Sequence, residues 1–137
     1  MKKFISIFLC VVILAGFLSS CSEKAVTPLS PVGIFVYEDK GCGSDFYIEI
    51  REDGTFSYST GLLASYFGYG EWTLDGDVLC LKDREYPSMK FVNYFKVKEK
   101  KLVFIENDST NFMYVKVADG DDFNKSDKIP PIKPYGA

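Results

Sequence analysis

The sequence contains no histidine. Histidine has the side-chain pKa nearest neutrality and is the commonest neutral metal ligand, so catalytic triads and zinc sites built on imidazole are excluded. The chain also lacks a glycine-rich phosphate-binding loop and a Gly-x-Ser-x-Gly nucleophile elbow. Its carboxylates, tyrosines, lysines and cysteines form no recognisable catalytic pair. We therefore expect a protein without enzymatic activity and without a cofactor or metal site.

Basic residues are too few for a nucleic-acid-binding chain. The 137 residues carry a formal net charge of −3, and nucleic acid is therefore not an expected partner.

Polar, low-complexity sequence is scarce as well, because 47% of the residues are hydrophobic and 16% are aromatic. Burial of so much apolar surface can offset the entropy of ordering the backbone. The length then supports one small folded domain.

The N-terminus has the pattern of an export signal. Lys2-Lys3 precedes the apolar run Phe4–Leu18, which is shorter than the roughly 20 residues needed to span a membrane. The run ends in Leu18-Ser19-Ser20-Cys21, which resembles the lipobox of bacterial lipoproteins. The resemblance implies that Cys21 receives a diacylglyceryl thioether and becomes the first mature residue. The alternative is an ordinary secretory signal that happens to end in a cysteine.

A lipid on Cys21 would place the protein in the cell envelope. The lipid would insert into the outer face of the cytoplasmic membrane or, in a two-membrane cell, into the outer membrane. Residues 1–20 are then the signal peptide, and residues 21–31 form a flexible tether. The folded domain is expected over residues 32–123. Residues 124–137 combine charge with three prolines and are expected to be a disordered tail.

Short segments with alternating apolar and polar residues fill the expected domain. In the clearest segment, Phe46, Ile48 and Ile50 share one face, which we expect to be buried. Similar alternation at even spacing indicates about eight strands joined by short turns. Residues 61–67 are left open between a strand, a helical turn and a lid. The remaining expected strands are 32–37, 56–59, two within 68–81, 90–98, 102–105 and 112–117.

The stretch 68–81 is expected to be the centre of the fold. Its two alternating runs are joined by Asp75-Gly76, which suits a two-residue hairpin loop with φ > 0 at both positions. Trp72 and Leu74 share one face of the first strand. We therefore expect the only tryptophan of the chain to lie inside.

No segment has a convincing helical period, and the short, evenly spaced strands favour an all-β, antiparallel, up-and-down barrel in meander order. A closed barrel leaves no exposed sheet edge. Repeated patterns such as 52–56 (Glu-Asp-Gly-Thr-Phe) and 70–74 (Gly-Glu-Trp-Thr-Leu) resemble those of small lipocalin-like lipoproteins of bacteria, many of which have no assigned function. The resemblance covers residues 32–123 and implies a lipocalin-like barrel.

Two groups of side chains are candidate sites. Cys42 and Cys80 either form a disulfide, as an exported domain allows, or remain two free thiols. The aromatic residues Tyr66, Phe67 and Tyr69 either line the mouth of a ligand site or fill and rim the barrel.

Two charged groups have simpler interpretations. Residues 119–122 (Asp-Gly-Asp-Asp) lack the glycine and the final glutamate that an EF-hand loop requires, so a solvated turn is favoured over a calcium site. The lysines at 96, 98, 100 and 101 could meet anionic lipid or a cell-wall polymer, but a solvated strand face is the commoner arrangement.

Two functions remain open. An eight-stranded barrel is just wide enough to be filled by side chains or to hold one small ligand. The 12 Phe and 9 Tyr residues favour a filled barrel. We therefore expect a lipid-anchored interaction module whose surface contacts an envelope protein or cell-wall polymer. The alternative is a barrel that binds a small apolar or aromatic ligand.

Overall fold

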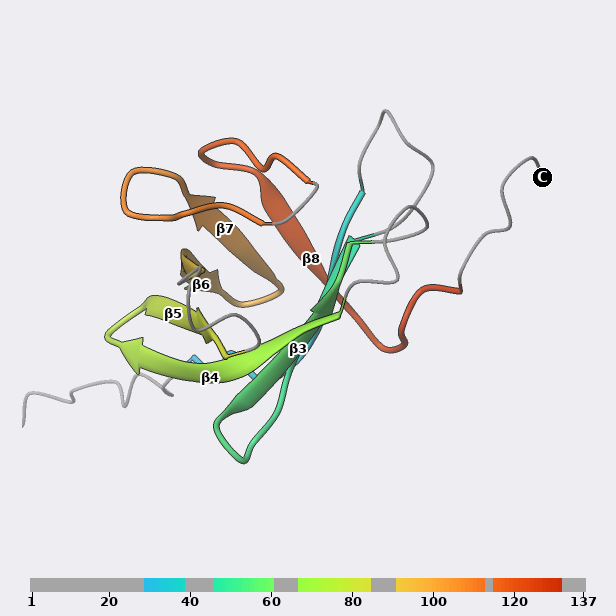
Figure 1. Ribbon diagram of the computed structural model, residues 1–137. Coiled ribbons are helices and arrows are strands. Elements are labelled where there is room, and N and C mark those ends of the chain that lie inside the picture. Colours follow the sequence, from blue (N-terminus) through green and yellow to red (C-terminus); the bar gives the residue numbers. More distant parts are fainter. Residues whose placement is uncertain (1–28, 39–45, 61–66, 85–90, 113–114, 132–137) are drawn as a thin grey trace, which may run out of the picture.

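Eight antiparallel strands, each paired with the next, close into a barrel in the computed structural model (Figure 1). The structure describes residues 29–38, 46–60, 67–84, 91–112 and 115–131. The barrel closes because β8 pairs with β1 as well as with β7. The strands are β1 (Gly33–Tyr37), β2 (Phe46–Ile50), β3 (Thr55–Ser59), β4 (Phe67–Asp75), β5 (Val78–Asp83), β6 (Val92–Lys98), β7 (Lys101–Ile105) and β8 (Asp122–Ser126).

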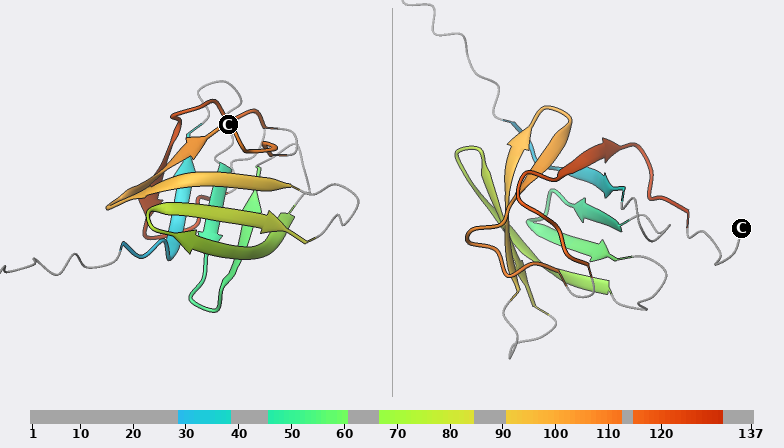
Figure 2. Two further views of the ribbon diagram at one scale, coloured as in Figure 1. Left: turned by 90° about the vertical axis from the view of Figure 1, so that its left-hand side faces the viewer. Right: turned by 90° about the horizontal axis from the view of Figure 1, so that it is seen from above.

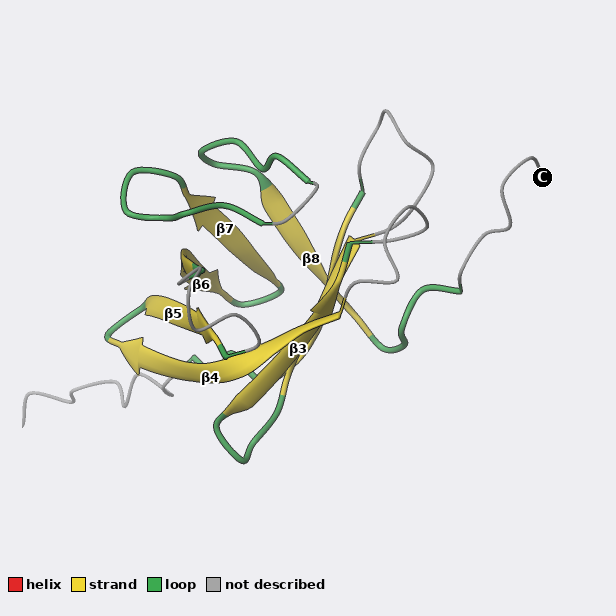
Figure 3. Cartoon of the chain, in the orientation of Figure 1, coloured by secondary structure: helices red, strands yellow, loops and turns green. Residues whose placement is uncertain are grey.

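The predicted all-β barrel in meander order is confirmed. The described part of the chain consists of strands and loops and contains no helix (Figure 3). It therefore offers no helix that could cross a membrane. The strands β1 to β3 run across the direction of β4 to β6, and the long strand β4 curves between the two sides of the barrel (Figure 2).

The interior is packed with apolar side chains. Phe46, Ile48 and Ile50 are each at most 1% exposed, as their alternation predicts. Phenylalanine rings from several strands meet at the centre, where Phe123 lies 5.1 Å from Phe46 and 5.2 Å from Phe95 between ring centroids. Both contacts are edge-to-face, an arrangement that aromatic pairs prefer. The other core residues are Phe35, Phe56, Tyr58, Leu79, Leu81, Val97, Leu102, Phe104, Phe112 and Val117.

The hairpin between β4 and β5 turns one residue later than predicted. Asp75 pairs with Val78, so the loop is Gly76-Asp77 rather than Asp75-Gly76. Of the two loop residues only Gly76 has a positive φ, at 59°, whereas the prediction required positive φ at both positions. The observed register places Leu74 opposite Leu79, while the predicted loop would have placed it opposite an aspartate. Apolar pairing therefore decides the position of the turn.

The prediction that Trp72 lies inside is only partly correct. Trp72 is half-buried and packs against the edge of the core rather than at its centre. Its indole Nε1 donates a hydrogen bond to the backbone oxygen of Arg51 at 2.9 Å. An indole N–H that is partly removed from water needs such a partner, and this contact ties β4 to the turn after β2.

The eighth strand is not the predicted one. Residues 112–117 were expected to form it, but β8 is Asp122–Ser126 and extends beyond the expected domain boundary at residue 123. Only Phe123 of this strand is buried, so alternation of apolar residues could not reveal it. Phe112 and Val117 are buried from a loop instead, where Phe112 forms a single bridge with Val115.

One side chain shapes the loop that carries Phe112. Asn111 has a φ of 69°, a left-handed conformation that asparagine tolerates better than most residues. Its Oδ1 accepts hydrogen bonds from the backbone N–H groups of Phe112 and Val117, both at 3.0 Å. Its Nδ2 donates to the backbone oxygen of Val117 at 2.8 Å. The loop can therefore bury two apolar side chains without strand pairing.

The two ends of the barrel differ. The short turns after β2, β4 and β6 lie at one end, which we call the tight-turn end. The chain also enters at this end, because Gly33 at the start of β1 pairs with Ile50 at the end of β2. Lys125 holds this entry by donating from Nζ to the backbone oxygen of Val32 at 3.0 Å. The longer connections, after β1, β3, β5 and β7, start from the opposite end.

Candidate functional site

Aromatic rings occupy the barrel interior where a ligand would sit. Phe112 reaches in from the loop before β8, and its ring centroid lies 4.8 Å from that of Phe46 and 5.0 Å from that of Tyr58. The ring of Phe112 therefore packs on the core beside the first residue of β2, Phe46. In the part of the chain that the structure describes, a shallow depression lies beside this loop, lined by Asn111, Phe112, Val115 and Lys116.

The strand β4 turns Phe67 and Tyr69 outward and Gly68 and Gly70 inward. A Cβ atom on Gly68 would lie 2.0 Å from Cε1 of Tyr58, so the ring of Tyr58 already fills that space. A Cβ atom on Gly70 would lie 1.9 Å from the backbone oxygen of Lys82. Only glycine fits at either position. The intervening residues must therefore point away from the core.

Phe67 and Tyr69 consequently lie on the outer face of the barrel. Their exposed fractions are 55% and 53%, which are high for large aromatic side chains. Together with Tyr66 they were predicted either to line the mouth of a ligand site or to fill and rim the barrel. The structure directs Phe67 and Tyr69 away from the interior, and Tyr66 lies outside the described residues.

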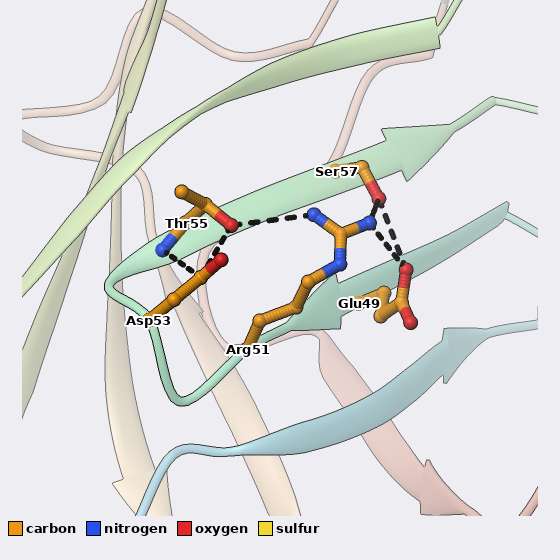
Figure 4. A network of polar contacts seen from close by, with 5 residues as sticks. All are labelled: Glu49, Arg51, Asp53, Thr55 and Ser57. Atoms are coloured by element: carbon orange, nitrogen blue, oxygen red, sulfur yellow. Dashed lines mark hydrogen bonds and ion pairs between the residues drawn. The ribbon is translucent and has the colours of Figure 1, made fainter.

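A polar network covers the neighbouring strands β2 and β3 (Figure 4). Arg51 donates from Nη2 to Oε2 of Glu49 at 2.6 Å and to Oγ of Ser57 at 2.7 Å. Its Nη1 donates to Oγ1 of Thr55 at 3.4 Å. Thr55 in turn donates from its backbone N–H and its hydroxyl to Oδ1 of Asp53, at 2.9 and 2.6 Å. The side chains of Arg51 and Glu49 are 41% and 31% exposed, so the network fixes geometry more than it stabilises the fold.

Strand pairing joins this network to the exposed aromatic residues. Ser57 lies between Glu49 and Tyr69 in the sheet. Ser59 lies between Tyr47 and Phe67. We call the resulting surface the aromatic face, and it consists of Tyr47, Glu49, Arg51, Ser57, Phe67 and Tyr69.

The electrostatics of the aromatic face are balanced. Partial burial and then the nearby charge of Glu49 raise the pKa of Tyr47 above its ordinary value, so its hydroxyl stays protonated at physiological pH. Arg51 pairs with Glu49 within the face, and Arg84 pairs with Glu71 at its margin. Each of these two arginines thus has a carboxylate beside it. Sequence alternation placed Tyr47, Glu49 and Arg51 on a solvated side but did not single them out as a site.

Of the three cysteines named in the predictions, the structure describes only Cys80. Cys21 and Cys42 lie outside the described residues, so their lipidation and pairing stay predictions. Cys80 is 8% exposed and has no disulfide partner among the described residues. It lies opposite Tyr94, and a hydrogen bond with the Cys80 side chain is the main cause that raises the pKa of Tyr94.

The aspartates at 119–122 engage separate partners. Oδ1 of Asp119 accepts from the backbone N–H of Glu106 at 3.0 Å. Oδ2 of Asp121 accepts from the hydroxyl of Tyr37 at 3.0 Å. Asp122 forms an ion pair with Lys101 at 2.6 Å. Among the described residues, no three acidic, cysteine or histidine side chains are grouped so that they could hold a metal ion.

Two of the four lysines at positions 96, 98, 100 and 101 are paired with carboxylates. Lys101 pairs with Asp122, and Lys96 pairs with Asp77 at 3.2 Å. These carboxylates offset part of the positive charge that an anionic lipid or polymer would need.

Two buried polar atoms lie among the inward-facing residues. Asn93 is 3% exposed, and its Oδ1 has no hydrogen-bond partner among the described residues. Its Nδ2 donates to the backbone oxygen of Asn111 at 3.4 Å. Thr60 is 6% exposed, and within the same described part of the chain its Oγ1 likewise has no partner. In the sequence, alternation placed Asn93 on the same face of its expected strand as Phe95 and Val97.

In the comparisons with known proteins, no family model, curated protein or solved structure matches the chain. The resemblance to lipocalin-like lipoproteins therefore stays a prediction.

Proposed function

We propose that this chain is a non-catalytic lipoprotein of the bacterial cell envelope and that its barrel acts through its outer surface. The observation that carries the proposal is the contrast between the two sides of the sheet. Inside, aromatic rings fill the barrel, whereas outside Phe67 and Tyr69 are more than half exposed. A barrel whose described core is packed with side chains and whose outer face carries exposed aromatic residues is suited to surface recognition.

The aromatic face has the composition of an interaction surface. Tyrosine, phenylalanine and arginine are enriched at interfaces, because they combine large apolar area with few rotatable bonds or with several hydrogen-bond donors. An aromatic side chain can bury about 150–250 Å², and roughly half of that area is still exposed at Phe67 and Tyr69. Arg51 is already held by Glu49 and Ser57, so a partner would bind it with little further loss of side-chain entropy.

The anchor is proposed from the residues around Cys21. The thiol of Cys21 would carry the diacylglyceryl group, and acyl chains contribute about 0.8 kcal/mol per buried CH₂, so that two or more hold a protein stably to a bilayer. Residues 21–31 would reach at most about 36–40 Å at 3.3–3.6 Å per residue. The barrel would then stay close to the membrane while remaining free to turn.

Small-ligand binding is the second candidate, and the orphaned polar atoms of Asn93 and Thr60 favour it. A buried acceptor without a donor costs about 1–3 kcal/mol. A ligand that donates a hydrogen bond would remove this cost, but so would a buried water molecule.

Crosslinking in intact cells tests the surface role. The full-length protein, its Phe67→Ser and Tyr69→Ser variants and a Thr73→Ser control are expressed in the native host and crosslinked. Thr73 is an exposed residue on the same side of β4. We expect a specific adduct that both serine variants lose and the control keeps. A stoichiometric small molecule in native mass spectra, with no such adduct, would instead support the ligand-binding function.

A further inference from the structure

We propose that the aromatic face binds an uncharged glycan, with the rings of Phe67 and Tyr69 stacking on its sugar residues. The inference rests on the proposed surface function and names the chemistry of the partner. A pyranose presents a face of C–H groups and an edge of hydroxyl groups. A site that binds it therefore needs an exposed aromatic ring beside both hydrogen-bond donors and hydrogen-bond acceptors.

The two rings form one platform. Phe67 and Tyr69 are two residues apart on β4 and point to the same side, so they are about 7 Å apart along the strand. Their inward neighbours are Gly68 and Gly70, where a Cβ atom would clash with the ring of Tyr58 and with the backbone of Lys82. The backbone of β4 is therefore held close to the rings of Tyr58 and Phe56, and this packing fixes the position of the strand that carries Phe67 and Tyr69.

Hydrogen-bonding groups lie along one side of this platform. Arg51 donates three hydrogen bonds, to Glu49, Ser57 and Thr55. A guanidinium has five N–H donors, so not all of them are used. Glu49 accepts through Oε2, and among the described residues its Oε1 accepts no bond. Donors and an acceptor thus remain on exposed, pre-oriented groups. Sugar hydroxyl groups can both donate and accept, and they match this mixture.

The charge balance favours an uncharged partner. Arg51 and Arg84 are each paired with a glutamate, and the whole chain has a formal charge of −3. Among the described residues, a polyanion such as a nucleic acid, a phosphate polymer or an anionic lipid surface would have to compete with these glutamates for Arg51 and Arg84, and it would be repelled by the net charge. A neutral glycan would avoid both costs.

The position of the anchor agrees with a partner beyond the membrane. The chain enters the barrel at the tight-turn end, where Gly33 pairs with Ile50. Phe67 lies at the opposite end of the sheet, paired with the last residue of β3. The tether therefore joins the end of the barrel farther from Phe67 and leaves the aromatic face accessible to polymers of the envelope.

Calorimetry with the full chain in detergent micelles tests the proposal. The probes are N-acetylglucosamine oligomers, a neutral glucan oligomer and, for contrast, polyphosphate. We expect a neutral oligomer to bind, with affinity lowered about tenfold or more by Phe67→Ser or Tyr69→Ser. Tyr69→Phe should retain most of the affinity, Thr73→Ser should retain all of it, and added salt should have little effect.

Two results would overturn the glycan proposal: binding of no neutral oligomer, or preference for polyphosphate with strong salt dependence. If cellular crosslinking still yields a protein adduct that Phe67→Ser and Tyr69→Ser abolish, the surface function stands and only the glycan is wrong. If neither assay responds to these substitutions, both proposals fail.

Discussion

Tyr58 of β3 covers Gly68 of β4 so closely that a Cβ atom on Gly68 would lie 2.0 Å from the ring. The ring is 1% exposed, and its hydroxyl donates to Oδ2 of Asp83 at 3.0 Å. An aromatic ring laid over a glycine on the next strand compensates for the side chain that glycine lacks. This pair both completes the core and directs Phe67 and Tyr69 outward.

Replacing Gly68 by alanine should therefore destabilise the protein. The added methyl group would force Tyr58 or the strand to shift, at a cost of about 1–3 kcal/mol in the free energy of unfolding. Chemical denaturation measures the change. The double variant Gly68→Ala/Tyr58→Leu should be less destabilised than the sum of the two single variants, because the leucine leaves room for the methyl group. Additive effects would show that the two residues do not interact as described.

Asn111 offers a matched pair of substitutions. Asn111→Gly keeps the backbone at its φ of 69° but loses three side-chain hydrogen bonds. Asn111→Ala loses the same bonds and adds strain in the left-handed region, worth about 1 kcal/mol. We expect both variants to unfold at lower denaturant concentration, alanine more than glycine. Equal stability of the two variants would contradict the assigned conformation.

Trp72 should contribute less to stability than a central core residue. Trp72→Phe keeps most of the apolar contact but removes the hydrogen bond from Nε1 to the Arg51 backbone oxygen, which is worth about 0.5–1.5 kcal/mol. We expect a loss of that size in thermal or chemical unfolding. The fluorescence of the wild-type protein should have a maximum between those of exposed and fully buried tryptophan. A fully buried emission spectrum would contradict the half-buried position.

Asp53 should make stability dependent on pH in acid. Hydrogen bonds from the hydroxyl and then the backbone N–H of Thr55 lower the pKa of Asp53 below its ordinary 3.8. The folded state therefore holds the proton less tightly than the unfolded state. The stabilisation is present above pH 3.8 and is lost as pH falls through the lower folded value. Asp53→Asn should flatten the stability profile in this range, and NMR titration of the carboxyl group should give the lowered pKa.

Cys21 should determine attachment to the membrane. Intact-mass analysis of the mature protein should find a diacylated or triacylated N-terminal Cys21. Cys21→Ser removes the thiol that would be alkylated, and the protein should then remain unacylated. Release of an unmodified mature form that begins at another residue would refute the lipid anchor, although the barrel would be unaffected.

The period of two in the sequence determined most of the fold. Alternation at Phe46, Ile48 and Ile50 predicted the buried face of β2, and the spacing of similar segments predicted the number of strands and their meander order. These features are local, because the apolar residues of each strand identify which face of that strand is buried.

Only the tertiary structure decided how the barrel closes and what its surface offers. β8 carries one buried apolar residue, Phe123, and its pairing with β1 joins residues about 90 positions apart. No local pattern reports a contact over that distance. In the same way, the outward direction of Phe67 and Tyr69 follows from the rings that cover Gly68 and Gly70, and those rings come from another strand. Local periodicity sets which side of a strand is apolar, but which strand lies beside it depends on packing of the whole chain.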